Sequence, residues 1–235
     1  MNRVDVLQKI IYRKGRCNYL EIGVRRGGCF FKIRGAKLKI AVDPAFSFSK
    51  KVFFFNILKN PSNIFRSSYF SMTSDDFFAK RKNYLKRKKL DLVFIDGLHT
   101  YEQSLADVRN TLQYLNPDGI IVMHDCSPES ELSATPAKSS LEVRQKLHCQ
   151  KEWNGNWSGD VWKTIVHLRT YEYLRVFVLD CDFGLGIIGY GKGSRLPFSH
   201  GHIQRMQYRD LAASRKELLN LRECVYLETF LETLK

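Results

Sequence analysis

The sequence lacks any apolar run long enough to cross a membrane. A membrane-spanning helix needs about 20 consecutive and mainly apolar residues, and no apolar run of this chain approaches that length. Residues 1–6 also lack the long apolar region of a secretory signal peptide. We therefore expect a cytoplasmic protein without a membrane span.

Closely spaced cysteine pairs are also missing. The six cysteines lie at positions 17, 29, 126, 149, 181 and 224, which excludes the paired spacing of a structural zinc site. A chain of 235 residues with 44% hydrophobic residues can build a core without disulfide bonds. We expect reduced thiols, and one large domain or a domain with an appendage.

Acidic residues are scarce relative to basic residues. The chain has 38 Lys and Arg residues against 24 Asp and Glu residues, so its formal net charge is +14 at pH 7. This excess favours anionic partners, such as nucleic acid, acidic glycans, nucleotide sugars or a membrane surface. The basic run at 80–89 lacks the aromatic spacing of a base-stacking platform. We interpret the run as the solvated end of a helix and leave its partner open.

Two short apolar runs are the clearest elements in the middle of the chain. Residues 92–95 and 120–123 have the length and β-branched content of buried strands. Continuous apolar runs are typical of a parallel sheet that is covered on both faces. Residues 101–115 carry apolar side chains at helical spacing. The order of strand, helix and strand predicts a parallel crossover in an α/β fold.

Each of these strands ends at a carboxylate with a histidine nearby. Asp96 follows the first strand and His99 comes three residues later, whereas His124 and Asp125 follow the second strand. Ligands of an open parallel sheet bind beyond the carboxyl ends of its strands, so we expect these side chains to converge on a site. Helix capping by the two aspartates is the alternative, but it explains the neighbouring histidines poorly.

A glycine-rich turn lies near the start of the chain. Residues 18–28 have the pattern of a strand, a turn and a helix start, and glycines there leave backbone N–H groups free to approach a ligand. Asp43 ends the next predicted strand, 43 − 21 = 22 residues after Glu21. An acid at this position holds ribose hydroxyls in nucleoside-binding sheets.

The other expected elements follow from the same patterns. We expect helices at 4–12, 74–88, 159–169 and 210–234, one more helix between 46 and 64, and strands at 39–43, 64–70, 174–179 and 185–190. The last two strands form a hairpin, so one strand of the sheet is antiparallel. Residues 127–158 are long for a connection, and a lid and an ordered surface insertion are both consistent with them.

Several of these segments together resemble the class I S-adenosylmethionine (SAM)-dependent methyltransferases. More narrowly, they are similar to the small-molecule O-methyltransferase branch that is related to macrolide-sugar and catechol-type enzymes. The resemblance covers roughly residues 17–190, and the order of the motifs makes it specific. The motifs lie at 21–28, 42–44, 73–78, 94–101 and 124–126.

The resemblance implies a Rossmann-like fold with a seven-stranded, mostly parallel sheet, one antiparallel strand and helices on both faces. It implies a methyltransferase domain at 1–190, with a lid or insertion at 127–158, and a C-terminal helical extension at 191–235. It also implies that SAM is the cofactor. The cofactor-binding residues would be Glu21, Gly23 and Gly27 in the turn, Asp43 at the ribose, Ser74 and Asp75 near the adenine, and Asp96.

The resemblance further implies a divalent metal, Mg²⁺ or another cation, held by Asp96 and Asp125. The catechol-type enzymes have an Asn where this chain has Cys126, which is a poor ligand for Mg²⁺, so His124 is the candidate for a further ligand. In the sugar-methylating relatives the residue that matches His99 is the general base. An imidazole with a pKa near neutrality suits that role. The alternative for His99 is a buried histidine that bonds the loop backbone.

We therefore expect a SAM-dependent methyltransferase that methylates a hydroxyl of a sugar or another polyhydroxyl small molecule, which is anionic or sugar-containing. The positive charge keeps an RNA methyltransferase as an alternative, although the sequence has no Asn-Pro-Pro-Tyr motif for base amines. A non-catalytic SAM-fold binding protein is the other alternative. The retention of Glu21, Asp43, Asp96 and His99 argues against it.

Overall fold

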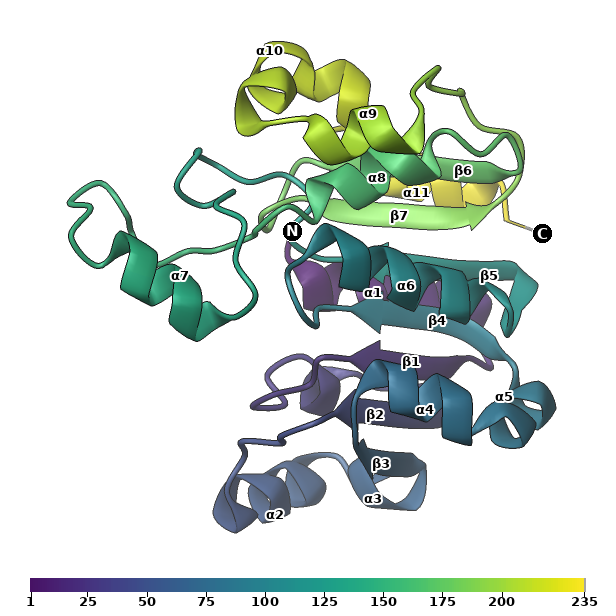
Figure 1. Cartoon of the computed structure of the whole chain (residues 1–235). Coiled ribbons are helices and arrows are strands. Elements are labelled where there is room, and N and C mark those ends of the chain that lie inside the picture. Colours follow the sequence, from purple (N-terminus) through teal and green to yellow (C-terminus); the bar gives the residue numbers. More distant parts are fainter. Residues whose placement is uncertain (235) are drawn as a thin grey trace.

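An eight-stranded sheet runs through the molecule in the computed structural model, which describes residues 1–234 (Figure 1). The strand order is β3-β2-β1-β4-β5-β7-β6-β8. β7 is antiparallel to both of its neighbours, and the other pairs are parallel. The strands are β1 (Asn18–Ile22), β2 (Leu38–Asp43), β3 (Ser67–Ser71), β4 (Leu90–Ile95), β5 (Leu115–Met123), β6 (Leu174–Leu179), β7 (Leu185–Tyr190) and β8 (Leu221–Arg222).

The expected mostly parallel sheet and the β6–β7 hairpin are confirmed. The prediction of seven strands was one short, because β8 pairs with β6 within the tail that we expected to be entirely helical. β1, β4 and the second half of β5 are buried almost throughout. Their continuous apolar runs therefore lie where helices cover both faces of the sheet.

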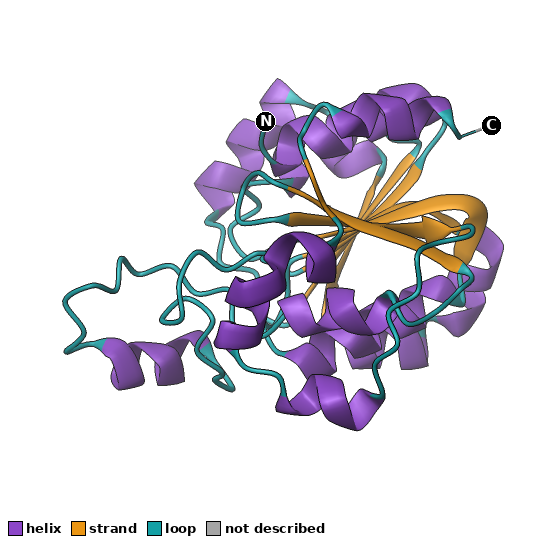
Figure 2. Cartoon of the chain, turned by 90° about the horizontal axis from the view of Figure 1, so that it is seen from above, coloured by secondary structure: helices purple, strands orange, loops and turns teal. Residues whose placement is uncertain are grey.

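Helices cover both faces of the sheet, which Figure 2 shows from above. α4, α6, α8 and α10 pack on one face, and α1, η1 and α11 pack on the other. The helices are α1 (Arg3–Lys14), the 3₁₀ helix η1 (Phe30–Lys32), α2 (Lys50–Lys59), α3 (Ser62–Phe65), α4 (Ser74–Lys80), α5 (Lys82–Lys88), α6 (Tyr101–Leu112), α7 (Ser140–Leu147), α8 (Trp162–Leu168), α9 (His200–Arg205), α10 (Tyr208–Leu219) and α11 (Tyr226–Glu232).

Two expected helices are interrupted. The helix expected at 74–88 divides into α4 and α5 at Arg81, whose backbone leaves the helical region with a φ of −114° and a ψ of 22°. The helix expected at 210–234 ends at Asn220, which adopts a left-handed conformation with a φ of +47°. Asparagine tolerates this conformation and commonly ends helices in this way. The chain then forms β8 before α11 begins.

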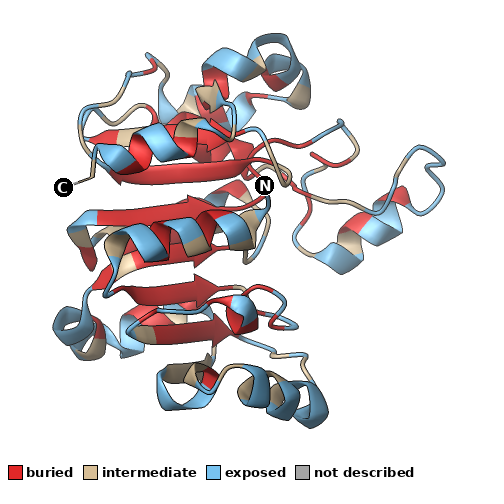
Figure 3. Cartoon of the chain, turned by 180° about the vertical axis from the view of Figure 1, so that it is seen from behind, coloured by how far each residue is buried: buried red, intermediate tan, exposed pale blue. Residues whose placement is uncertain are grey.

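The segment after residue 190 packs onto the same sheet as the rest of the chain. Leu211 and Leu219 of α10 belong to the core on one face, and Leu227 and Phe230 of α11 belong to the core on the other face. Figure 3 shows the buried sheet and the exposed outer sides of the helices. The boundary at residue 190, between the expected methyltransferase domain and the expected C-terminal extension, stays a prediction.

The segment 127–158 leaves the sheet and folds around α7 at the carboxyl edge of the central strands (Figure 1). It has a small apolar cluster of its own, in which Trp153 and Trp157 pack against Ala137, Val143 and Leu147. Within residues 1–234, no helix is both long enough and apolar enough to cross a membrane.

Candidate functional site

A cavity of about 1260 Å³ opens at the carboxyl edge of the sheet, between the glycine turn after β1 and the segment 127–158. All but one of the residues that the sequence singled out line this cavity. Gly27 is the exception, although its neighbour Gly28 does line it. The lining residues that were predicted are Glu21, Gly23, Asp43, Ser74, Asp75, Asp96, His99, His124 and Asp125.

Backbone geometry explains the glycines of the turn. Gly23 has a φ of +88°, and a Cβ atom on it would lie only 2.0 Å from the carbonyl oxygen of Asp96, so the close approach of the turn to β4 requires glycine. Gly27 has a φ of +73°, and a Cβ atom there would lie 2.2 Å from the ring of Phe31. Glycine at position 27 therefore allows the ring of Phe31 to pack behind the turn.

Asp43 is held by backbone donors. The backbone N–H of Arg25 donates to its Oδ2 atom and that of Ala45 donates to its Oδ1 atom, each at 2.7 Å. Arg25 adopts a left-handed backbone conformation with a φ of +48°. The two bonds fix the carboxylate at the wall of the cavity, and each oxygen keeps a lone pair for a ligand hydroxyl.

Glu21 lies at the base of the cavity and is only 1% exposed. The hydroxyl of Tyr19 donates a hydrogen bond to its Oε2 atom at 2.5 Å. Burial raises the pKa of Glu21 to about 8, and the negative charge of Asp96 adds to this rise while the bond from Tyr19 opposes it. Glu21 is therefore mainly neutral at pH 7.

Ser74 and Asp75 lie in the first turn of α4, where Thr73 caps the helix by accepting a hydrogen bond from the backbone N–H of Asp76. The amide of Gln103 connects this turn to α6, because it donates to Ser74 and Asp75 at 3.3 Å and to Asp107 at 3.1 Å.

Gln103 and Asp107 also line the cavity, and the sequence reading missed both. Burial raises the pKa of Asp107 to about 6. Their spacing of four residues places them on one side of α6, which is the signal that could have identified them.

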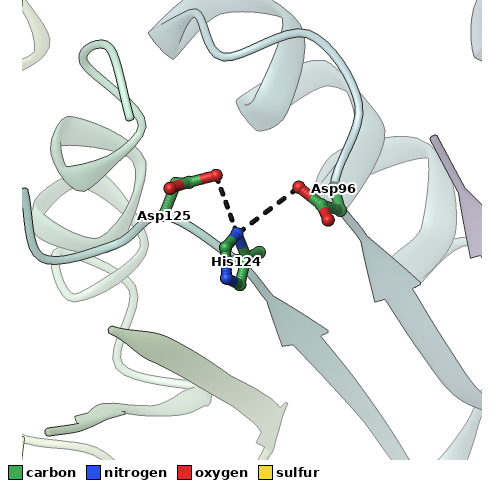
Figure 4. A group of neighbouring side chains, drawn as sticks. All are labelled: Asp96, His124 and Asp125. Atoms are coloured by element: carbon green, nitrogen blue, oxygen red, sulfur yellow. Dashed lines mark hydrogen bonds and ion pairs between the residues drawn. The ribbon is translucent and has the colours of Figure 1, made fainter. Parts of the chain in front are cut away.

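Asp96, His124 and Asp125 form a compact group where β4 and β5 end (Figure 4). The Nδ1 atom of His124 lies 2.7 Å from Oδ2 of Asp125 and 3.4 Å from Oδ1 of Asp96. One ligand atom from each residue falls within a span of 4.8 Å. Ser158 of the long segment donates a hydrogen bond to Oδ1 of Asp125 at 2.8 Å. The predicted convergence of these acids and His124 is thus present in the structure.

His99 completes this group. Its Nε2 atom lies 3.5 Å from Oδ1 of Asp96 and 3.4 Å from Oδ2 of Asp125. Its Nδ1 atom lies 2.7 Å from the carbonyl oxygen of Trp157, and its ring stacks on that tryptophan with the centroids 5.1 Å apart. A carbonyl oxygen only accepts, so Nδ1 carries a hydrogen and Nε2 faces the carboxylates.

Arg3 and Asp182 belong to the same network, and the sequence reading did not identify them. The guanidinium of Arg3 donates to Oδ2 of Asp96 at 2.9 Å and makes two bonds to Asp182, at 2.9 and 3.0 Å. His124 faces Asp182 with its Nε2 atom at 3.6 Å. Arg3 thus connects the start of α1 to the acids at the ends of β4 and of the β6–β7 hairpin.

The charges of this network reinforce one another. Burial alone would raise the pKa of Asp96, but His124 and the hydrogen bonds from both histidines hold it well below its usual range. Burial alone would lower the pKa of His99 and His124, but the carboxylates of Asp96 and Asp125 raise both values. The structure therefore favours an ionised Asp96 beside protonated imidazoles.

The donor set at the group can accept a divalent cation. Two carboxylate oxygens and one imidazole nitrogen suit Mn²⁺ or a similar first-row ion better than Mg²⁺, which prefers oxygen ligands. Cys126 does not take part, because its buried Sγ atom contacts the carbonyl oxygens of Met123 and His124 at 3.3 and 3.5 Å. A metal would thus be held by Asp96, His124 and Asp125.

Residues 20–126 match the sequence profile of a family described as "Methyltransferase domain". No curated protein matches the chain.

Solved structures with a similar fold span most of the chain. One is the O-methyltransferase TomG from Streptomyces achromogenes, which is involved in tomaymycin synthesis and was solved in complex with SAM. TomG is 11% identical to this chain, with a TM-score of 0.55, and the match covers 80% of this chain and 79% of TomG. The O-methyltransferase from Bacillus cereus, in complex with S-adenosylhomocysteine, is 18% identical (TM-score 0.52; coverage 79% and 78%). The methyltransferase PaMTH1 from Podospora anserina, also bound to S-adenosylhomocysteine, is 17% identical (TM-score 0.51; coverage 81% and 78%).

Proposed function

We propose that this chain, which matches a methyltransferase-domain family over residues 20–126, transfers the methyl group of SAM to a hydroxyl oxygen of a sugar or another polyhydroxyl small molecule. The observation that carries the proposal is the position of His99. Its Nε2 atom faces the cavity beside Asp96 and Asp125, while its Nδ1 atom is held by the carbonyl oxygen of Trp157.

The cofactor would occupy the half of the cavity that the glycine turn borders. Asp43 offers a fixed carboxylate to the ribose hydroxyls, and Gln103 orients Ser74 and Asp75 toward the adenine. Glu21 is buried at the base of this half, where a cationic group of SAM would favour its ionised form.

The acceptor would lie between the cofactor and the segment 127–158. Methyl transfer from a sulfonium is an in-line displacement that depends mainly on alignment, and the attacking hydroxyl must also lose its proton. The neutral imidazole of His99 would accept that proton at Nε2. Bonding of Nδ1 to the Trp157 carbonyl keeps the ring in the orientation and tautomer that this step requires.

The metal also belongs to the proposal. Asp96, His124 and Asp125 would hold a divalent cation, and such a cation would bind acceptor hydroxyls and lower their pKa. It would also offset the two carboxylates that raise the pKa of His99. His99 would then be neutral at a lower pH and could act as a base there.

The lining of the acceptor side supports a sugar-containing or anionic small molecule. Trp153 and Trp157 contribute large amphipathic surfaces from the long segment, and Arg144 of α7 contributes a cation. Arg25, Arg26 and Lys32 add positive charge on the cofactor side. Such a lining favours an acceptor that carries both hydroxyls and a negative group.

Two experiments test the proposal. Mass spectrometry of the purified protein should detect bound SAM or S-adenosylhomocysteine. Labelled SAM with panels of sugars, nucleotide sugars, phenols and RNA should then label a polyhydroxyl small molecule, and His99→Ala should slow that labelling by at least about 100-fold. Labelling of RNA alone, or of amines alone, would contradict the proposed acceptor class.

A further inference from the structure

An apolar surface with basic edges lies on α2 and α3, outside the cavity. Residues 44–74 contain four basic residues and no acidic residue. Leu58 and Phe65 remain 82% and 85% exposed, and Figure 3 shows exposed residues along both helices. We call this surface the α2–α3 face. Its apolar residues are Val52, Phe54, Phe55, Leu58, Ile64 and Phe65.

The packing of α2 leaves this face without a role in the core. On its inner side, Phe53 stacks on Phe48 at 5.9 Å and packs edge-on against Phe31 and Tyr69 at 6.1 and 5.6 Å. These contacts hold α2 to the body of the protein, yet no residue of α2 is fully buried. Apolar side chains on both sides of a helix normally indicate that both sides are covered. A contiguous exposed group of them marks an interaction surface.

The charges around the face indicate what covers it. Lys50, Lys51, Lys59 and Arg66 are all exposed, and the ammonium of Lys59 lies 4.3 Å from the centre of the Phe55 ring. A surface that combines aromatic and aliphatic side chains with cations alone is complementary to a negatively charged, apolar partner. This is the composition of helices that lie in the interface of an anionic bilayer. Lysine stems can follow the apolar surface while their charges reach the lipid phosphates.

We propose that the α2–α3 face docks the protein on the surface of an anionic lipid bilayer. Phe54, Leu58 and Phe65 enter the headgroup region, and the four cations contact the lipid phosphates. α2 follows the carboxyl end of β2 (Figure 1), and Asp43 and Pro44 at that end line the cavity. Docking therefore brings the cavity close to the lipid surface. The proposal does not depend on which acceptor is methylated.

Vesicle flotation tests the proposal with the full chain. The protein is mixed with vesicles of phosphatidylcholine alone or of phosphatidylcholine with phosphatidylserine, at the same total lipid concentration. We expect flotation with the anionic vesicles, weak or no flotation with the neutral vesicles, and a decrease as salt is raised. Absence of binding to anionic vesicles overturns the proposal.

An apolar variant tests insertion without changing the charge. Phe54→Ser, Leu58→Ser and Phe65→Ser together should lower the partition coefficient on anionic vesicles by at least about tenfold, since each side chain loses its burial in the interface. The control is Val225→Ser, which changes a 72% exposed residue outside the face. Unchanged SAM affinity in both variants shows that the fold is kept.

A charge variant tests the cations. Replacement of Lys50, Lys51, Lys59 and Arg66 by glutamine should weaken binding by about fivefold for each cation. The matched control removes the same charge from α5 by replacing Lys82, Lys86, Arg87 and Lys88, and it should bind far better than the face variant. Equal losses in the two variants would overturn the proposal, because net charge alone would then explain binding.

A protein partner would give a different pattern. A dimer that the apolar variant converts to a monomer, with vesicle binding that the same variant leaves unchanged, would assign the face to a second copy of the chain and overturn the proposal. Light scattering of the parent and the apolar variant provides this measurement.

Discussion

The acids on the two sides of the cavity are held by different kinds of donor. On the cofactor side, both oxygens of Asp43 accept hydrogen bonds from backbone N–H groups. On the acceptor side, Asp96 and Asp125 are contacted by the side chains of His99, His124 and Arg3. Backbone amides cannot lose their protons near neutral pH, whereas imidazoles can.

In the proposed function, this difference separates the residues that bind the cofactor from those that take part in the chemical step. The donors of Asp43 are fixed by the fold, so its carboxylate is preorganised for a neutral hydroxyl ligand. The imidazole donors of Asp96 and Asp125, His99 and His124, can lose their protons, and a cation can then replace those protons. A change on one side of the cavity can therefore be measured against the other side as the reference.

Metal removal is expected to have the largest effect, and only on the acceptor side. Dialysis against a chelator should abolish methyl transfer, because a cation that stabilises the reacting oxygen contributes several kcal/mol. Mn²⁺ should restore the activity better than Mg²⁺, since the group includes an imidazole nitrogen. Paramagnetic resonance of added Mn²⁺ provides a readout that does not depend on activity.

The SAM affinity of the chelated protein is the control for this experiment, and it should be unchanged. Full activity in the presence of chelator would mean that the reaction needs no metal and that Asp96 and Asp125 only position other groups. Unaltered Mn²⁺ resonance in Asp125→Ala would mean that the ion binds elsewhere.

Loss of the base is expected to be the next largest effect. His99→Ala should lower kcat by about 10²–10⁴-fold, which is the usual contribution of a general base, while SAM still binds. The rate of the parent should fall as the pH falls through the pKa of His99, because the protonated imidazole cannot accept a proton. The neighbouring carboxylates raise that pKa, and a bound cation that offsets them would move the fall of the rate to lower pH.

His202→Ala is the matched control, because His202 is exposed on α9 and does not line the cavity. If kcat of His99→Ala stayed near that of the parent, His99 would have only a structural role, which is to hold the segment around Trp157. Loss of SAM binding in the same variant would show that the loop after β4 had collapsed.

The cofactor side should respond in affinity and not in the chemical step. Asp43→Ala should weaken SAM binding by about 10- to 150-fold, or about 1.5–3 kcal/mol, because the ribose hydroxyls lose a charged acceptor. Calorimetry measures this, with Asp76→Ala as the control, because Asp76 is an acid in the first turn of α4 that does not line the cavity. Equal SAM affinity in Asp43→Ala and the parent would exclude the ribose contact.

The convergence of the site could be predicted because it follows from topology. β4 and β5 are adjacent and parallel, so the residues after them meet at one edge of the sheet, and this brings together Asp96, His99, His124 and Asp125. Asp43 reaches the same edge from β2 by the same rule. Hydrophobic patterns and strand ends, which are local in the sequence, were sufficient for these residues.

The remaining parts of the site depend on contacts that no local pattern encodes. Arg3 and Asp182 are 179 residues apart in the chain, and their pairing depends on how α1 packs on the sheet, against β4 and α11. β8 is only two residues long and exists because β6 offers it an edge. The contact of Trp157 with His99 likewise depends on how the long segment folds back, which its composition did not determine.

A change at Glu21 is expected to have the smallest effect. Glu21 also differs from Asp43, because its partner is a side chain and not the backbone. It lies on the cofactor side, yet a side chain holds it, and burial raises its pKa to about 8. Because its folded pKa is raised, Glu21 is mainly protonated at pH 7, and binding of the cationic SAM should drive its proton off. SAM affinity should therefore rise between pH 7 and about pH 8 and then level off, with a total change below tenfold.

Calorimetry in two buffers of different ionisation enthalpy should detect the released proton. Glu21→Gln keeps the shape of the side chain and cannot ionise, so it should remove this released proton and the pH dependence, while any titration of SAM itself remains. Equal proton release in Glu21→Gln and the parent would show that Glu21 is already ionised in the free protein.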